Sequence, residues 1–241
     1  MLKYQHTARE LIRYIEEHKL EYGHKLPNIE EMMNQFQVSK NTVIKALDEL
    51  ERHGIIYQVR GSGIFVRGHR RTGYINLVEI HGFNSALREF EIDSIVLDLK
   101  VVKATPEVQA NLQVDGEQDV YYVKRLRSIE GRIFCIEESY YNKDIVPYLN
   151  QEIASDSIFS YLVNDLKLKV GFLDHFLRVR KLSEEEAGHL TLKKDDPAAT
   201  VESIFYLSNG QAFDYSKIVY HYEEAQFFIQ GNSYYNLMSS R

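Results

Sequence analysis

Cysteine is nearly absent from this chain of 241 residues, in which Cys135 is the only one. A single cysteine excludes an intrachain disulfide and argues against a zinc site built from cysteines. We therefore expect Cys135 to be a small apolar residue of the core. The nine histidines show no metal-ligand spacing such as HExxH. No metal ion and no other cofactor is predicted.

Long apolar runs are also missing. Nowhere do eighteen apolar residues follow one another, which is about the length that a helix needs to cross a bilayer. The first ten residues are polar and charged, unlike a signal peptide. Neither a G-x-S-x-G nucleophile elbow nor a phosphate-binding Gly-Lys-Ser/Thr loop occurs. These absences predict a cytoplasmic protein that does not bind membranes, with no sign of catalysis.

The net charge of -6 is unevenly distributed along the chain. Residues 1 to 71 contain 12 Lys and Arg against 9 Asp and Glu, which leaves 17 basic and 26 acidic residues for the remainder. Such an asymmetry suits a DNA-binding head on an acidic body, although solvated helix faces produce it as well.

Two helices are expected early in the chain. The first runs from about Thr7 to Lys19, because Thr7 and Glu10 have capping-box spacing and apolar residues then recur on one helical face. The second begins after Asn28, a good N-cap, and ends near Gln35.

A third helix follows after only two residues. Ser39 can cap it, and Gly54 ends it. Two helices joined this tightly cross steeply, as in helix-turn-helix units. Beyond them, residues 55–57 and 64–66 are short β-type runs that flank the glycine-containing hairpin 60–63. The hairpin is predicted to be the wing of a winged helix-turn-helix over residues 1–66.

The exposed start of the third helix and the tip of the wing carry the groups that could contact DNA. Polar and basic side chains there suit phosphates and base edges, although a lysine in such a place can also belong to an ordinary solvated face. The candidate DNA-binding residues are Lys40, Asn41, Thr42, Lys45, Gly61, Ser62 and Gly63.

This stretch resembles the GntR family of winged-helix regulators, and the resemblance covers nearly the whole head. It is carried by the runs FQVSKNTV from Phe36, GII from Gly54 and GSGIFV from Gly61. The resemblance implies that Lys40 takes the place of a base-reading Arg and that Gly61 enters the minor groove. Glu30 departs from the pattern, because a DNA-contacting Arg is usual there. A different operator or weaker affinity is therefore expected.

Residues 67–74 are basic and contain glycine, so they are read as a linker, with a larger domain over residues 75–241. This body contains an internal repeat with a period of about 78 residues, found by sliding the chain on itself. Each unit runs strand, helix, hairpin, and the hairpins turn at Gly131 and Gly210. The repeat predicts an α+β domain with an antiparallel sheet and pseudo-twofold symmetry.

Arg125 and Arg127 are the candidate anion-binding residues of the body. They are two apart on a predicted strand, so both side chains leave the same face. A turn of three residues at 130–132 would place Glu137 opposite Arg125 on that face, and a turn of two residues would send it to the other. An ordinary surface Arg-Glu pair is the competing interpretation.

The body resembles the UTRA ligand-binding domain of the HutC subfamily of GntR regulators, whose fold is similar to chorismate lyase. The resemblance rests on the runs RLR from Arg125, EESY from Glu137, SIF from Ser157 and DYS from Asp214, and on Tyr220. In members of this family that sense sugar phosphates, paired arginines, a loop and a serine at the start of a helix hold the phosphate, and the resemblance implies the same arrangement here. The effector-binding residues implied here are Asn84, Ser85, Arg125, Arg127, Glu137, Ser157, Phe159, Asp214 and Tyr220.

Together these features predict a bacterial regulator that binds double-stranded operator DNA as a homodimer, with repression favoured over activation. Its DNA binding is expected to respond to a small anionic effector such as a sugar phosphate. Two alternatives stay open. One is a DNA-binding protein that acts without a ligand, and the other is an enzyme of chorismate-lyase-like fold.

Overall fold

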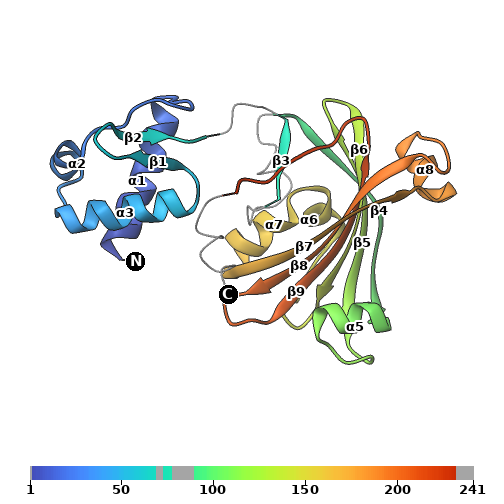
Figure 1. Ribbon diagram of the computed structural model, residues 1–241. Coiled ribbons are helices and arrows are strands. Elements are labelled where there is room, and N and C mark those ends of the chain that lie inside the picture. The colour runs from blue at the N-terminus through green and yellow to red at the C-terminus, as the bar shows by residue number, and fades with distance from the viewer. Residues whose placement is uncertain (1, 69–72, 78–89, 232–241) are drawn as a thin grey trace, which may run out of the picture. The chain divides into compact units, whose positions relative to one another are not determined.

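The computed structural model describes residues 2–68, 73–77 and 90–231. The chain forms two compact units, drawn in Figure 1. One unit takes in residues 1–72 together with 229–241, and the other residues 73–228. The positions predicted at Asn84 and Ser85 lie outside the described residues.

The first unit is a winged helix-turn-helix. Its elements are α1 (Lys3–Glu17), α2 (Ile29–Phe36), α3 (Lys40–Arg52), β1 (Ile56–Val59) and β2 (Gly63–Val66). The strands pair antiparallel to form the wing. Leu11, Met32, Val43 and Leu47 form the centre of its core, each no more than 1% exposed. The apolar stripes of the three helices therefore meet in one core, as amphipathic helices require.

Two of the three predicted helix starts are confirmed. The Asn28 side chain accepts a hydrogen bond from the Glu31 backbone N–H, and the Asn28 backbone N–H donates one to the Glu31 carboxylate. Ser39 caps α3. The predicted start at Thr7 is wrong, because α1 begins at Lys3 and Thr7 is buried inside it. Its hydroxyl bonds back to the Lys3 carbonyl, a competing partner that capping-box spacing does not reveal.

The second unit is an α+β domain built on a six-stranded antiparallel sheet, ordered β4-β5-β6-β9-β8-β7. The strands are β4 (Ile92–Lys103), β5 (Asp119–Ile129), β6 (Arg132–Asn142), β7 (Val170–Lys181), β8 (Pro197–Leu207) and β9 (Ala212–His221). The helices are α5 (Pro106–Leu112), α6 (Gln151–Ser155), α7 (Ile158–Ser160) with a π-helical turn (Tyr161–Asp165), and α8 (Glu184–Leu190). A separate parallel pair joins β3 (Tyr74–Asn76) to β10 (Gln226–Phe228).

The predicted internal repeat is confirmed by this strand order. The units β4-α5-β5-β6 and β7-α8-β8-β9 meet where β6 pairs with β9. Glu138 lies opposite Lys217 at the centre of that pairing, and the register runs out symmetrically from them: Cys135 opposes Tyr220 and Tyr141 opposes Asp214. Thr105 and Ser183 cap the two equivalent helices. A pseudo-twofold axis therefore passes through the middle of the sheet.

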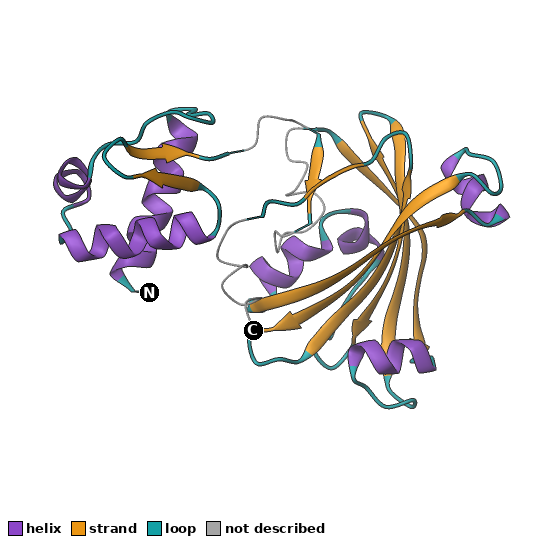
Figure 2. Ribbon diagram, viewed as in Figure 1, coloured by secondary structure: helices purple, strands orange, loops and turns teal. Residues whose placement is uncertain are grey.

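The two faces of the sheet are covered differently, as Figure 2 shows. One face packs against α6 and α7, where Val123, Tyr141 and Phe213 meet Ala154 and Ile158. The opposite face carries α5 and α8 in separate apolar clusters. Because side chains alternate along a strand, each strand contributes to both cores. The face under α6 and α7 holds the candidate effector site.

Candidate functional site

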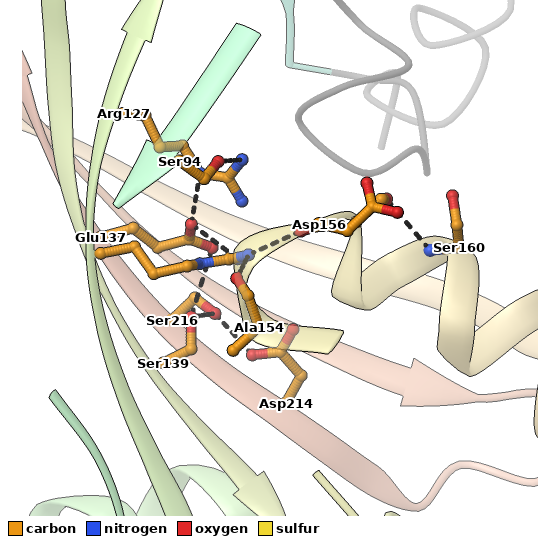
Figure 3. Close-up of polar contacts among 11 residues, drawn as sticks. Ser94, Arg127, Glu137, Ser139, Ala154, Asp156, Ser160, Asp214 and Ser216 are labelled. Carbon is orange, nitrogen blue, oxygen red and sulfur yellow. Dashed lines mark hydrogen bonds and ion pairs between the residues drawn. The ribbon is translucent and has the colours of Figure 1, made fainter. Parts of the chain in front are cut away.

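Arg125, Arg127 and Glu137 form a buried charged cluster on this face (Figure 3). Arg125 Nη2 donates to Glu137 Oε2 at 2.8 Å, and Arg127 Nε donates to the same oxygen at 2.7 Å. The three residues are 2%, 3% and 7% exposed. Burial opposes the charge of Glu137, but the arginines outweigh it and lower its pKa to about 2. The carboxylate is therefore ionised at neutral pH.

Glu137 lies opposite Arg125, although the hairpin has the two-residue turn that was expected to send Glu137 to the other face. The turn is two residues long, Glu130 and Gly131, and both have positive φ, as type I′ hairpins require. A β-bulge then shifts the register next to Arg127, so that Arg125 comes to lie opposite Glu137. The bulge supplies the extra residue that the turn lacks.

The Arg125 side chain is further fixed by the backbone that follows α6. Its Nη1 donates to the carbonyl oxygens of Ala154 and Asp156, at 3.1 and 3.3 Å. Among the described residues, its Nε is buried without a hydrogen-bond acceptor. Arg127 Nη1 donates to Ser94 Oγ at 3.1 Å. One guanidinium is thus anchored by a helix end and the other by the edge strand β4.

A line of short polar side chains continues from Glu137 to Asp214. The Ser139 hydroxyl donates to Glu137 Oε1 at 3.3 Å and lies 2.8 Å from the Ser216 hydroxyl, which lies 2.5 Å from Asp214 Oδ1. Burial raises the pKa of Asp214 to about 8. Each serine has one proton to donate. If Asp214 is neutral, its carboxyl proton can be donated to Ser216, Ser216 can donate to Ser139, and Ser139 can donate to Glu137. Every contact in the line is then a hydrogen bond with its own proton.

The predicted effector residues that are described surround one cavity of about 90 Å³. Those among its lining are Arg125, Arg127, Glu137, Ser157, Phe159, Asp214 and Tyr220. Ser157 also caps α7 by accepting from the Ser160 N–H at 3.2 Å. The cavity is smaller than the 300–1,000 Å³ typical of small-molecule sites.

Sequence reasoning missed several lining residues, chiefly His175, Ser203, Phe205 and Ser216. The Nδ1 of His175 lies 2.8 Å from Ser203 Oγ. Burial lowers the pKa of His175. Because side chains alternate between the two faces along a strand, the sequence of β7 and β8 could have shown which of these residues share a face. Their place in the cavity depends on strand pairings that the sequence does not show.

On the first unit, the candidate DNA-binding residues lie at two exposed places. Lys40, Asn41 and Lys45 are exposed on α3, while Thr42 is half-buried, with its hydroxyl 2.9 Å from Ser39 Oγ. Gly61 has a φ of +79° and open space around it, as a glycine at the tip of a wing would. The arrangement presents the first turn of α3 and the wing tip to solvent.

In the part of the chain that the structure describes, no group of three His, Cys, Asp or Glu side chains could hold a metal ion. The helices within the described ranges are too short or too polar to cross a membrane. Cys135 is fully buried, as expected for a core residue.

Together, the winged helix-turn-helix and the sheet domain define a transcriptional regulator with an effector-binding domain. Residues 3–66 match the description "Bacterial regulatory proteins, gntR family", and residues 88–226 match "UTRA domain". The chain belongs to the GntR family of bacterial regulators and carries a UTRA domain.

Several relatives have the same architecture. The chain is 55% identical to the uncharacterized HTH-type transcriptional regulator YydK of Bacillus subtilis (strain 168), over 97% of this chain and 99% of the relative. The crystal structure of YydK superposes with a TM-score of 0.83, covering 96% of this chain and all of that one. The regulator GmuR of the same organism is 32% identical over 90% of this chain and 92% of its own. The mannosyl-D-glycerate transport/metabolism system repressor MngR of Escherichia coli (strain K12) is 25% identical, over 93% of both chains.

Proposed function

We propose that the protein is a cytoplasmic repressor that binds operator DNA as a homodimer and is released by a small anionic effector such as a sugar phosphate. The observation that carries the proposal is the pair of buried guanidiniums, Arg125 and Arg127, that share one carboxylate beside a cavity. The relative MngR is named as a repressor of a transport and metabolism system for a sugar derivative. That name supports both repression, as opposed to activation, and an effector of the sugar class.

The charge of the cluster favours an anion. Two ionised arginines and one ionised Glu137 leave one positive charge in excess, because burial keeps Asp214 neutral at pH 7. A buried excess charge is costly, and an anion that enters the cavity removes that cost. Forked guanidiniums also match the geometry of phosphate oxygens. We infer that the phosphate contacts Arg125, Arg127 and Ser157.

The remaining lining residues suit the uncharged part of the effector. Glu137 and Tyr220 would bind hydroxyl groups, and Phe159 would lie against the ring. Asp214 is assigned the same role, but in its neutral form it can donate a hydrogen bond as well as accept one. The proposed role of Asn84 and Ser85 in phosphate binding rests on the family resemblance alone.

Effector binding would act on DNA affinity through the proposed linker, residues 67–74. A ligand shifts such an equilibrium only by its differential affinity for two states. A coupling of about 1 to 3 kcal/mol would change operator affinity about 5- to 150-fold.

A thermal-shift screen with sugar phosphates and their non-phosphorylated counterparts tests the proposal. We expect a phosphorylated sugar to stabilise the protein by about 2.7 kcal/mol at a concentration of 100 Kd. Arg127→Gln should abolish this stabilisation, since it removes a forked donor. The matched control is Arg178→Gln, whose side chain is 64% exposed in a surface pair with Glu202.

Other results would favour the alternatives. Equal stabilisation by phosphorylated and unphosphorylated sugars, or none by any of them, would contradict an anionic effector of this class. A DNA-binding protein without a ligand would show unchanged DNA binding in every case. Chemical conversion of a bound sugar phosphate would indicate an enzyme, whereas we expect its recovery unchanged.

Lys40→Ala tests the DNA-binding surface. Against an operator enriched from random DNA by the wild-type protein, we expect affinity to fall by about 1 to 3 kcal/mol, because a base-edge contact is lost. Affinity for bulk DNA should fall much less. Arg52→Ala is the control, because Arg52 lies at the other end of α3, paired with Glu49. Equal losses on both DNAs would show that Lys40 contacts only phosphate.

A further inference from the structure

The pseudo-twofold axis brings the two halves of the sheet to the same cavity. Arg125 on β5 lies opposite Glu137 on β6, and the equivalent pair in the second half is Ser203 on β8 opposite Ser216 on β9. Arg125, Glu137, Ser203 and Ser216 all line the cavity. Equivalent positions are therefore cationic and acidic in one half and hydroxyl-bearing in the other.

In the second half, the edge strand β7 adds His175 to this arrangement. His175 lies opposite Ser203, Ser203 opposite Ser216, and Ser216 opposite Ser139. These four side chains form a polar row across β7, β8, β9 and β6. Residues directly opposite on neighbouring strands have Cβ atoms about 4.5 to 5.5 Å apart. The row is thus continuous across four strands, and His175, Ser203 and Ser216 within it line the cavity.

The hydrogen bonds along the row leave one gap. His175 Nδ1 lies 2.8 Å from Ser203 Oγ, and Ser216 Oγ lies 2.8 Å from Ser139 Oγ. Ser203 and Ser216 lie opposite each other and are 2% and 3% exposed, but no hydrogen bond joins their two side-chain hydroxyls. A polar group of a ligand placed there would find a hydroxyl on either side.

The His175 end of the row is uncharged at neutral pH. Burial lowers the pKa of His175, and Asp174, its neighbour on β7, acts weakly in the opposite direction. A neutral imidazole has one donor and one acceptor nitrogen. The ring is packed edge-to-face with Phe205, their centroids 6.4 Å apart. This end of the cavity therefore offers polar but neutral partners beside an aromatic wall.

We propose that His175 and Ser203 form the second polar end of the effector site and bind a hydroxyl group on the uncharged part of the effector. This inference rests on the proposed function and adds specificity-determining residues to it. Arg125 and Arg127 come from β5 and His175 from β7, and all three side chains line the same cavity. An effector whose phosphate is held by the arginines and whose hydroxyl contacts His175 therefore lies across both halves of the repeat.

Isothermal titration calorimetry with full-length variants tests this assignment. The probes are the hexose phosphate that most stabilises the wild-type protein, its monodeoxy derivatives, and inorganic phosphate. Ser203→Ala and His175→Leu should each weaken binding of the hexose phosphate about 10-fold, the size of one lost hydrogen bond. Inorganic phosphate should bind the wild type and both variants with dissociation constants that differ by no more than about twofold. His175→Gln, which keeps a donor and an acceptor, should recover most of the loss.

One monodeoxy derivative should bind the wild type and Ser203→Ala equally well, because it lacks the hydroxyl that the pair contacts. His189→Leu, on α8 and not among the lining residues, is the control and should change nothing. Unchanged hexose phosphate binding in Ser203→Ala and His175→Leu would overturn the inference, while a loss in Arg127→Gln would still support the proposed function. Equal losses for hexose phosphate and inorganic phosphate would assign the pair a structural role. Failure of every sugar phosphate to bind the wild type would overturn both proposals.

Discussion

Glu137→Gln should lower the free energy of unfolding by about 3 to 5 kcal/mol at pH 7. The substitution keeps the shape of the side chain but removes the charge that Arg125 and Arg127 share. Both guanidiniums then stay buried without a counter-ion, which costs far more than a lost surface pair. Urea denaturation of the wild type and the variant measures the difference, if the free energy of unfolding falls with urea concentration at the same slope in both.

Glu138→Gln is the matched control for this experiment. Glu138 is the next residue on β6, faces the opposite side of the sheet and pairs with Lys124 at 3.1 Å, with its side chain 33% exposed. We expect a loss of no more than about 1 kcal/mol. A loss in Glu137→Gln no larger than this would contradict the buried-charge argument.

Acid should reduce the effect of Glu137→Gln. The folded-state pKa of Glu137, about 2, is lowered from an unfolded value near 4.3. Its ionisation therefore contributes stability above about pH 4.3, and this contribution is lost as the pH falls toward 2. The two proteins should approach each other in stability over that range. Added inorganic phosphate should stabilise Glu137→Gln more than the wild type at pH 7, because an anion replaces the missing charge.

Asp214→Asn should remove a loss of stability that the wild type shows as the pH rises. This is the reverse of the effect of Glu137, whose contribution is lost as the pH falls. The folded-state pKa of Asp214, about 8, is raised above an unfolded value near 3.9. The folded protein therefore holds a proton that the unfolded chain loses, and stability falls as the pH rises from about 4 to 8. The fall reaches up to about 1.4 kcal/mol per pH unit. Asn has no such proton, so the variant should gain on the wild type across this range.

Thermal or urea denaturation at half-unit steps from pH 5 to pH 8.5 gives the comparison. Asp98→Asn, at a half-buried residue on β4 that pairs with Lys100, serves as control and should run parallel to the wild type. Parallel curves for Asp214→Asn and the wild type would show that Asp214 is ionised in the folded protein. Asp214 would then act only as an acceptor for an effector hydroxyl.

Local sequence signals predicted much of the fold. Asn28 and Ser39 were found by their capping positions, because a cap involves residues close together in the chain. Thr7 failed on the same criterion, since burial gave its hydroxyl a partner within the helix. The repeat was visible because each unit keeps the order of its elements, and that order led to the antiparallel sheet.

The candidate site was predictable only in part. The strand period placed Arg125 and Arg127 on one face, yet the position of Glu137 depended on a bulge that the sequence does not mark. His175 and Ser203 share the site with Arg125 because β6 pairs with β9 and so joins the two halves of the sheet. Pairings between β6 and β9 join residues about 80 positions apart, and no local pattern encodes them.

The strand order also bears on how the domain folds. Within each half, strands pair with their neighbours in sequence, so most contacts form after short loops close. Among the described strands, the two halves are joined only by the pairing of β6 with β9, which requires a long loop and is expected to form late. Arg125 comes from one half and Asp214 from the other, so the cavity exists only after this seam closes. An effector that binds there should therefore slow separation of the two halves and protect the amides of β6 and β9 from hydrogen exchange.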